Sequence, residues 1–311
     1  MEIIFCANPL NPQNVDSDYI REARVVSSSL LYYSIINYEA LVDDHDIEKA
    51  LKRIPKTKQY RPAIYRGWMM TPEQYAIFYH ALEHHGIKLI NTPMQYQHCH
   101  YLPENYSIIQ EMTPKTVWVK NGIDAKVFPE QQFLRQEDFS ITAIMKTLEP
   151  FGDCPIILKD YVKSQKHYWH DACFISSAID DIAVSKVVQR FLELQGHPEG
   201  GLVFREYVPF ESIGRHPKSG MPLSLEYRIF FWHKKPIAIF PYWYEKKYPQ
   251  MELPLKKFEK VAQLVNSHFF TMDVAKSQEL GWMIVELGDG QVAGLPDNVD
   301  IKAFYQKIAP K

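Results

Sequence analysis

Short apolar runs alternate with segments of helical spacing through the first hundred residues. The apolar runs predict strands at residues 3–5, 39–42, 63–65 and 87–90. Helical spacing predicts helices at residues 18–31 and 46–54, and a third helix that begins after residue 71. Strands that alternate with helices in this way are typical of an α/β domain with a mostly parallel sheet.

The clearest helix signal along the chain begins at Thr71. Thr71 has the side chain of an N-cap, Pro72 occupies the first helical position, and Gln74 completes a capping box. The apolar side chains that follow recur at helical spacing: Tyr75, Phe78, Tyr79 and Leu82. We therefore expect a helix with one buried face that ends near Gly86.

The pattern changes beyond residue 91. Residues 91–115 contain three prolines and are interpreted as irregular, with a domain boundary at 105–115. Strands are then expected at 116–120, 155–159, 172–175, 202–207, 223–232, 237–242, 269–274, 283–287 and 292–295, with helices at 139–148, 181–195 and 255–266. Residues 233–235 and 288–290 are hairpin-sized connections. This half of the chain predicts an α+β fold with a large antiparallel sheet.

Composition and charge exclude several classes of protein. The chain has 311 residues, is 46% hydrophobic and carries a net charge of −2, which excludes nucleic-acid binding by bulk positive charge but not by a local basic groove. No apolar run approaches the roughly 20 residues of a membrane-spanning helix. The first residues, MEIIFCANPLNP, lack the pattern of a signal peptide. We therefore expect a cytoplasmic protein with reduced cysteines and no membrane partner.

Two familiar kinds of site are not predicted. Residues 98–100 read His-Cys-His, but adjacent residues on a strand point to opposite faces and rarely share one metal ion. The glycine-rich fingerprints GxxxxGK[ST] and GxGxxG are both missing from the sequence. A nucleotide, if bound, is therefore held without those loops.

Charged residues lie inside or at the ends of apolar strands, where burial is costly unless the charge is paired or faces a ligand. They are, in chain order, Lys120, Lys159, Glu206, Glu226, Arg228, Asp273, Glu286 and Asp289. Lysine and arginine suit a polyphosphate, and carboxylates on adjacent strands suit Mg²⁺. Taken singly, each of these residues could also be a strand-end charge that faces solvent.

The order of these residues resembles the ATP-grasp superfamily. The likeness is greatest to the bacterial and phage ATP-grasp proteins of the arginine-to-lysine clade, on the segments YRGWMMTPEQY, CPIILKDYVKSQKHYWHDACFI, FREYVPFES, EYRIFFWHKKPI and MIVELGDGQVAGLP. It extends from about residue 60 to residue 296. The resemblance implies an N-terminal substrate domain (residues 1–110), a small central α+β subdomain (111–205) and a C-terminal subdomain with a large antiparallel sheet (206–311).

The resemblance also implies a nucleotide site. Lys120 and Lys159 would contact the phosphates of ATP, with Lys159 acting in catalysis as a point charge. Residues 160–171 would form a flap whose donors are Lys163, Ser164, Lys166 and His167, although an exposed polar hairpin is the alternative. The backbone of Glu206, Tyr207 and Val208 would bind the adenine edge, and Glu211 the ribose.

Catalysis and metal binding follow from the same resemblance. Arg228 would stabilise the transferring γ-phosphate and the acyl-phosphate transition state. Asp273, Glu286 and Asp289 would bind one or two Mg²⁺ ions. The superfamily usually has asparagine two residues after the glutamate, where this chain has Gly288, so Asp289 is either the replacement ligand or a turn residue.

The N-terminal half is expected to bind the substrate. Arg66 follows a predicted strand and could grip a substrate carboxylate, or it could stack on Trp68 or pair at the domain interface. The expected activity is an ATP- and Mg²⁺-dependent ligase that joins a small-molecule or peptide carboxylate to an amine through an acyl phosphate.

Two other functions stay open from the residues. Aromatic side chains beside lysines, namely Tyr168, Trp169 and Trp243 beside Lys163, Lys166, Lys246 and Lys247, suit a module that binds a nucleotide or single-stranded nucleic acid. A phosphotransferase on the same fold is the third hypothesis.

Overall fold

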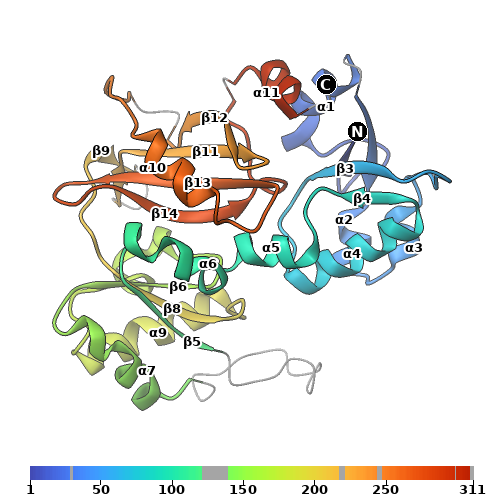
Figure 1. The fold of residues 1–311 in the computed structure, drawn as a ribbon. Helices are drawn as coiled ribbons and strands as arrows, with labels where there is room; N and C mark the ends of the chain where they lie inside the picture. Colours follow the sequence, from blue (N-terminus) through green and yellow to red (C-terminus); the bar gives the residue numbers. More distant parts are fainter. Residues whose placement is uncertain (29–30, 121–138, 217–220, 244–246, 298, 309–311) are drawn as a thin grey trace.

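The computed structural model describes the chain except residues 29–30, 121–138, 217–220, 244–246, 298 and 309–311. Lys246 lies outside the described residues, as do residues 29–30 near the end of the first predicted helix. Within the described part, three four-stranded sheets and one two-stranded sheet form the framework (Figure 1). The fold class is the expected one, a parallel sheet followed by antiparallel sheets.

The N-terminal sheet is parallel, in the order β2-β1-β3-β4. Its strands are β1 (Glu2–Cys6), β2 (Tyr32–Ile36), β3 (Arg61–Arg66) and β4 (Ile87–Leu89). Side chains alternate between its faces, so Ile4 and Cys6 pack in one core while Ile3 and Phe5 pack in another. The first core includes α2 (Tyr38–Val42), α3 (Ile47–Leu51) and α4 (Pro72–His84). The second includes α1 (Ile20–Ser27) and the distant C-terminal helix α11 (Ile301–Ile308).

The predicted helix after Thr71 is confirmed as α4, with its capping box formed in both directions. The same signal recurs at Thr92, where Pro93 and Gln95 begin α5 (Pro93–His100). A further helix, α6 (Leu102–Ile109), follows at once. The interpretation of residues 91–115 as irregular was therefore wrong, because two of the prolines there stand at helix starts, where a missing N–H costs nothing.

A second error concerns residues 39–42. They form the end of α2 instead of a strand, since Asn37 caps the helix by accepting from the N–H of Ala40. The second strand of the sheet is β2, which ends before this helix begins. Tyr32 and Tyr33 are exposed on β2, so the strand lacks the continuous apolar run by which the other strands were predicted.

The second sheet is antiparallel, in the order β5-β8-β6-β7. Its strands are β5 (Thr116–Lys120), β6 (Ile156–Asp160), β7 (Phe174–Ile175) and β8 (Gly201–Glu206). The helices α7 (Ile141–Leu148) and α9 (Asp181–Gln195) share its core, and the short α8 (Trp169–Ala172) precedes β7. This arrangement leaves the other face of the sheet free to line a cavity.

The third sheet is also antiparallel, in the order β12-β11-β13-β14. Its strands are β11 (Glu226–Trp232), β12 (Lys235–Pro241), β13 (Phe269–Ser277) and β14 (Gly281–Asp289). A separate hairpin of β9 (Ser212–Arg215) and β10 (Pro222–Ser224) precedes it, which splits the single strand expected at 223–232. The helices α5, α6 and α10 (Leu255–Ala262) contribute to its core.

The segment after β14 differs from the prediction of a hairpin at residues 288–290 and a strand at 292–295. β14 continues to Asp289, and the chain then turns toward the N-terminal sheet. There Nη1 of Arg66 donates to the carbonyls of Gly290, Gln291 and Ala293. These carbonyls are thus satisfied by a side chain and not by a strand partner.

In the described part of the chain, no helix is both long and apolar enough to cross a membrane.

Candidate nucleotide site

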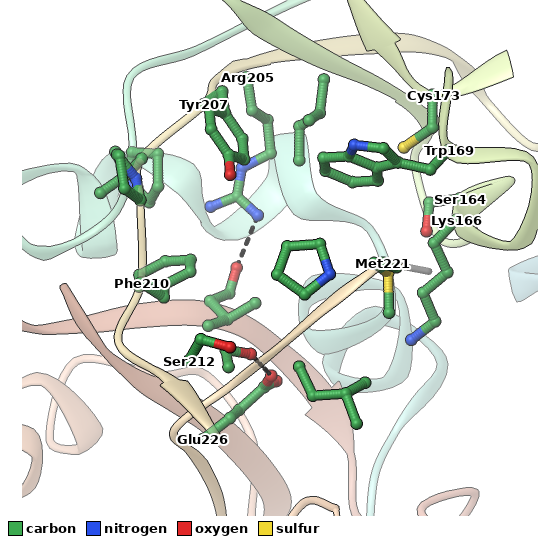
Figure 2. A pocket seen from close by; sticks show the side chains of 18 of the residues that line it. Ser164, Lys166, Trp169, Cys173, Arg205, Tyr207, Phe210, Ser212, Met221 and Glu226 are labelled. Carbon is green, nitrogen blue, oxygen red and sulfur yellow. Dashed lines mark hydrogen bonds between the residues drawn. The ribbon is translucent and has the colours of Figure 1, made fainter. Parts of the chain in front are cut away.

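A cavity of about 280 Å³ lies between the second and third sheets (Figure 2). One wall comes from β6, the end of β8 and the segment 207–210. The opposite wall comes from the β9–β10 hairpin, β11 and β14. Segments far apart in sequence therefore meet around one space, and most of the charged strand residues predicted from sequence lie on its walls or directly behind them.

Part of the cavity wall is apolar. Its lining residues include Ile157, Met221 and Leu223 and the ring of Trp169. The ring of Tyr207 packs edge-on against Phe174, with ring centroids 5.2 Å apart. A flat heteroaromatic ring fits between such walls.

The backbone of residues 206–208, which line the cavity, offers a hydrogen-bonding edge. The N–H groups of Glu206 and Tyr207 donate to the carbonyls of Lys115 and Pro155, at 2.8 and 2.9 Å. Within the described residues, the N–H of Val208 has no such partner, and Val208 lines the cavity. Residues 206–208 can therefore present a donor to the cavity, and their binding of an adenine edge stays a prediction.

Lys159 places a cation in the wall of the cavity. Its side chain is buried, its Nζ donates to the carbonyl of Val162 at 3.1 Å, and it lies 3.9 Å from Oε2 of Glu286. Burial lowers the pKa of Lys159. An ammonium held in a poorly hydrated wall is a strong partner for an anion that enters the cavity.

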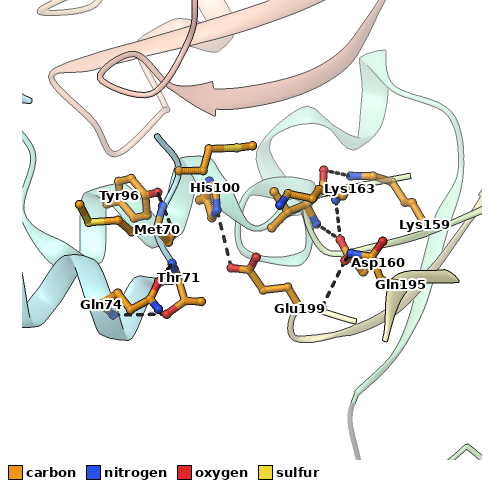
Figure 3. A network of polar contacts seen from close by, with 12 residues as sticks. Met70, Thr71, Gln74, Tyr96, His100, Lys159, Asp160, Lys163, Gln195 and Glu199 are labelled. Atoms are coloured by element: carbon orange, nitrogen blue, oxygen red, sulfur yellow. Dashed lines mark hydrogen bonds and ion pairs between the residues drawn. The ribbon is translucent and has the colours of Figure 1, made fainter. Parts of the chain in front are cut away.

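The next residue, Asp160, points to the opposite side of β6 and organises the loop after it (Figure 3). Its Oδ1 accepts from the N–H groups of Val162 and Lys163. Its Oδ2 accepts from Nε2 of Gln195 at 2.9 Å and from the N–H of Glu199 at 3.2 Å. Asp160 thus fixes the start of the predicted flap behind Lys159.

The predicted flap residues divide into two groups. Ser164 and Lys166 line the cavity, and Lys166 Nζ lies 5.3 Å from the ring centroid of Trp243 and 5.5 Å from that of Tyr242. Lys163 and His167 are exposed and are not among the cavity-lining residues of the described chain. Lys166 therefore brings the predicted flap into contact with Tyr242 and Trp243, which follow β12 of the third sheet.

Arg228 and two carboxylates are aligned across three neighbouring strands. Arg228 on β11 pairs in register with Asp273 on β13, which pairs with Glu286 on β14. Arg228 binds Asp273 through two contacts, Nε to Oδ1 at 2.8 Å and Nη2 to Oδ2 at 2.6 Å. Its guanidinium also stacks over Tyr242, 5.0 Å from the ring centroid. The predicted catalytic arginine and two predicted metal ligands are thereby brought together.

Glu226 adds a third carboxylate to this group. It lies two residues before Arg228 on β11, lines the cavity and is buried. Burial, and then the charge of Asp273, raises the pKa of Glu226. Burial also raises the pKa of Asp273, against the lowering effect of Arg228. Three carboxyl groups, those of Glu226, Asp273 and Glu286, thus lie near the single guanidinium of Arg228.

This excess of carboxylate suits a divalent cation. No group of three or more His, Cys, Asp or Glu side chains in the described chain is arranged as a ready-made metal cage. Mg²⁺, however, is commonly bound by one or two carboxylates together with water and substrate phosphates. Glu286, which is 36% exposed and lines the cavity, and its neighbour Asp273 fit that role.

Arg205 is a cavity residue that sequence reasoning overlooked. It is buried, and it donates to the carbonyl of Val285 and to Oγ1 of Thr113, both at 2.7 Å (Figure 2). Burial lowers the pKa of Arg205 to about 10. The available signal was an arginine inside the apolar strand LVFREYV, next to the glutamate that was chosen instead.

Two predicted nucleotide residues lie outside the cavity. Lys120 is exposed at the end of β5, opposite Gly201. Glu211 forms an ion pair with Lys276, at 2.8 Å, and is not among the described cavity-lining residues. Lys159 therefore lines the cavity of the described structure, and Lys120 and Glu211 do not.

Asp289 stands three residues after Glu286 on β14 but has different partners. It is buried beside the N-terminal sheet, where it accepts from Nδ2 of Asn91 at 2.6 Å and from the N–H of Gln291 at 2.9 Å. Burial raises the pKa of Asp289 to about 6. Of the two roles considered for Asp289, ligand or turn residue, its surroundings favour the second, because its oxygens hold the turn after β14.

Three roles were considered for Arg66: binding a substrate carboxylate, stacking on Trp68 and pairing at the domain interface. Its contacts match the third. Its side chain is 0% exposed and makes two contacts of 2.9 Å with Glu22. With its three carbonyl acceptors after β14, it has no N–H edge open to a substrate in the described structure. The expectation that Arg66 grips a substrate carboxylate is corrected by this burial.

The family model for the ATP-grasp domain, family 3 of the arginine-to-lysine clade, matches residues 150–308, slightly more than half of the chain. The chain belongs to this ATP-grasp family. The predicted resemblance is therefore confirmed. No curated protein matches the chain.

Solved ATP-grasp structures share the fold over nearly the whole chain. A RimK domain ATP-grasp protein from Sphaerobacter thermophilus superposes with a TM-score of 0.58 at 11% identity, covering 99% of this chain and 98% of that one. D-cycloserine synthetase DcsG superposes with a TM-score of 0.57 at 14% identity, covering 99% of this chain and 98% of that one. The ATP-grasp ligase PsnB, solved with a minimal precursor, Mg and ADP, superposes with a TM-score of 0.54 at 10% identity, covering 98% of this chain and 96% of that one. At these identities the likeness shows the fold alone.

Proposed function

We propose that this ATP-grasp protein is an ATP- and Mg²⁺-dependent ligase that activates a carboxylate as an acyl phosphate for attack by an amine. The observation that carries the proposal is the single cavity that joins the adenine-type edge at residues 206–208 to Lys159 and Glu286. The apolar lining and the backbone edge suit a base, and the charged side chains suit a polyphosphate with Mg²⁺.

In this proposal ATP lies along the cavity. The N–H of Val208 donates to the adenine edge, and the apolar wall near Trp169 covers the ring. Lys159, Ser164 and Lys166 face the phosphates as donors. Mg²⁺ held by Glu286 and Asp273 would neutralise part of the phosphate charge. Residues 163 and 167 would be able to approach only by movement of the loop, since both are exposed.

The reaction consists of two displacements. An oxygen of the substrate carboxylate attacks the γ-phosphorus, the bond to the β–γ bridging oxygen breaks, and ADP leaves. The amine then attacks the acyl carbon, inorganic phosphate leaves, and the nitrogen loses a proton. Arg228 and Lys159 stabilise the charge that develops during both steps, and no covalent enzyme nucleophile is needed.

The names of structural neighbours support the choice of a ligase. DcsG is a synthetase, and PsnB is a ligase solved with a minimal precursor, Mg and ADP. A small-molecule or peptide acid and an amine are therefore the substrates to screen first.

The first experiment measures thermal unfolding with ATP and Mg²⁺, with ATP and EDTA, and with GTP. Ligand at a hundredfold excess over Kd stabilises the native state by about 2.7 kcal/mol. We expect a Mg²⁺-dependent rise with ATP, after which acids and amines are screened for ADP release. No shift at millimolar ATP would contradict the proposed site.

The second experiment tests the charged residues. Lys159→Ala and Glu286→Ala should abolish ADP release while the protein stays folded, and Lys186→Ala, an exposed lysine on α9, is the matched control. Full activity in both site variants would overturn the proposal. ADP formed with a stable phosphorylated product, and no joined product, would indicate the phosphotransferase instead.

A further inference from the structure

A second cavity, of about 210 Å³, adjoins the proposed ATP cavity at Tyr242, which lines both. The ring centroid of Tyr242 lies 5.5 Å from Nζ of Lys166, which lines the ATP cavity. It lies 5.0 Å from Cζ of Arg228, which lines the second cavity. A ligand in the second cavity would therefore be one aromatic ring away from the proposed phosphates.

The lining of the second cavity is apolar except for one cation. Arg228 is the one charged residue among the described lining residues, and the side chains of Phe240, Leu295 and Pro296 are apolar. Of the five N–H donors of a guanidinium, two are used by Asp273, and the others have no hydrogen-bond partner among the described residues. A ligand carboxylate can therefore bind Arg228, whereas a ligand cation finds no acidic side chain in this described lining.

The apolar walls are packed firmly and enclose a small space. Phe240 packs edge-on against the buried Phe230, with ring centroids 5.9 Å apart. Phe240 and Leu295 both pack against the core that includes α1 and α11. An apolar cavity of about 150 Å³ takes up benzene, so the space here is of a size for a phenyl ring or a branched alkyl chain.

Contacts from the N-terminal half hold the wall at residues 294–296 from both sides. Directly before it, Nη1 of Arg66 donates to the carbonyl of Ala293 at 2.8 Å. Directly after it, Nη1 of Arg21 lies 3.0 Å from Oδ1 of Asp297. A wall that is fixed at both ends keeps its shape, and selection of a ligand by size and polarity requires such a wall.

We propose that the second cavity binds the acid substrate, and that this acid has one carboxylate on a compact, uncharged, apolar body. Arg228 binds the carboxylate, and Phe240, Leu295 and Pro296 surround a phenyl or branched alkyl group. The inference rests on the proposed function, because the acid must meet ATP beside Tyr242. It adds the class of acid and the residues that select it.

The test uses hydroxylamine in place of the unidentified amine, since hydroxylamine converts an acyl phosphate into a hydroxamate and inorganic phosphate. ADP and hydroxamate are measured with isocaproate, hydrocinnamate, glutarate and ε-aminocaproate, and with the matching α-amino acids leucine, phenylalanine, glutamate and lysine. The best apolar acid should exceed every acid with a charged side chain by about 100-fold or more in kcat/KM, because a charge in the apolar cavity loses its hydration without gaining a partner.

A substitution in the wall should redirect this preference. Leu295→Arg adds a second cation, so the kcat/KM ratio should shift toward glutarate or glutamate by about tenfold or more, the range for a hydrogen bond between charged groups. Leu264→Arg is the matched control, because Leu264 is 62% exposed, and it should leave the ratio unchanged. Thermal unfolding and ATP affinity show that each variant is folded.

The outcomes separate the two proposals. If the unaltered protein binds no ATP, the proposed function and the inference both fall. If it binds ATP but uses the charged acids equally well, or none of these acids, only the assignment of the acid falls. An unchanged ratio in folded Leu295→Arg also overturns the assignment. Should Leu295→Arg not fold, Phe240→Leu decides: a raised KM for the apolar acid at unchanged KM for ATP supports the assignment, and an unchanged KM for the acid overturns it.

Discussion

Two arginine–carboxylate pairs in this protein have the same chemistry and different surroundings. Arg66 and Glu22 lie between the N-terminal sheet and its covering segments, with side chains 0% and 5% exposed. Arg228 and Asp273, 23% and 2% exposed, lie next to the cavity-lining residues Glu226 and Glu286. Both pairs are bidentate. What differs is the rest of the coordination around each arginine.

The first pair is closed on every side. Nη1 of Arg66 donates to three carbonyls, and the hydroxyl of Tyr305 donates to Glu22. Arg228 contacts a tyrosine ring and a carboxylate, and it lines the second cavity, of about 210 Å³, together with Tyr242. The comparison teaches that an arginine with all its donors engaged stabilises the fold, whereas one beside open space can act on a ligand.

The largest effect is expected from breaking the closed pair. Arg66→Met leaves Glu22 buried without its partner and should lower the free energy of unfolding by about 3–5 kcal/mol. Urea unfolding measures it. Arg21→Met is the control, because its ion pair with Asp297 is exposed and should contribute about 0–1 kcal/mol. Equal losses of unfolding free energy in the two variants would contradict a stabilising role for the buried Arg66–Glu22 pair.

The second prediction concerns the open pair. Arg228→Lys keeps the charge but loses the planar fork, so ADP release should fall about 100- to 1,000-fold, the cost of removing a preorganised donor. The loss of stability should be smaller than for Arg66→Met, since solvent can reach the cavity. Retained activity combined with a large loss of stability would show that Arg228 stabilises the fold and does not act on the ligand.

The third prediction separates the two carboxylates of β14. Glu286→Gln should raise the Mg²⁺ concentration for half-maximal ATP binding by about tenfold or more. Asp289→Asn should leave that concentration unchanged but cost about 1–3 kcal/mol of stability, because the amide has one acceptor oxygen in place of two, so either Asn91 or Gln291 loses its acceptor. Mg²⁺ titrations and urea unfolding on both variants check this. A changed Mg²⁺ requirement in Asp289→Asn would restore Asp289 as a ligand.

The smallest effect is expected on the pH dependence of stability, and it comes from the carboxyl group of Glu199. Glu199 lies 3.7 Å from Nε2 of His100, at the contact of α5 with the β6–β8 sheet (Figure 3). Burial, and then Asp160, raises the pKa of Glu199 to about 7 from 4.5. Burial, and then Lys159, lowers the pKa of His100 to about 3.

The sign of the effect follows from proton binding. The folded chain keeps the proton of Glu199 up to about pH 7, while the unfolded chain releases it near pH 4.5, so this group's contribution to stability falls as pH rises between these values. Glu199→Gln should remove that decline, measured as unfolding free energy from pH 5 to 8. Glu193→Gln, an exposed glutamate on α9, should keep it. A slope unchanged in Glu199→Gln contradicts the assignment.

Local signals in the sequence determined several features of this protein. Thr71, Pro72 and Gln74 were enough to place α4, because capping is a contact between residues three apart. The order of charged residues in apolar strands led to the ATP-grasp family, since a buried charge needs a partner or a ligand. That order also singled out Lys159, Arg228 and Glu286, which the structure brings to one region.

Only the tertiary structure decided which charged residues face the cavity. Glu211 and Ser212 are neighbours, and a shift of one position in an extended segment exchanges the sides of their side chains. Arg66, Arg205 and Asp289 have partners up to 227 residues away in the chain, which no local pattern encodes. Whether a buried charge stabilises the fold or meets a ligand depends on how completely such distant groups surround it.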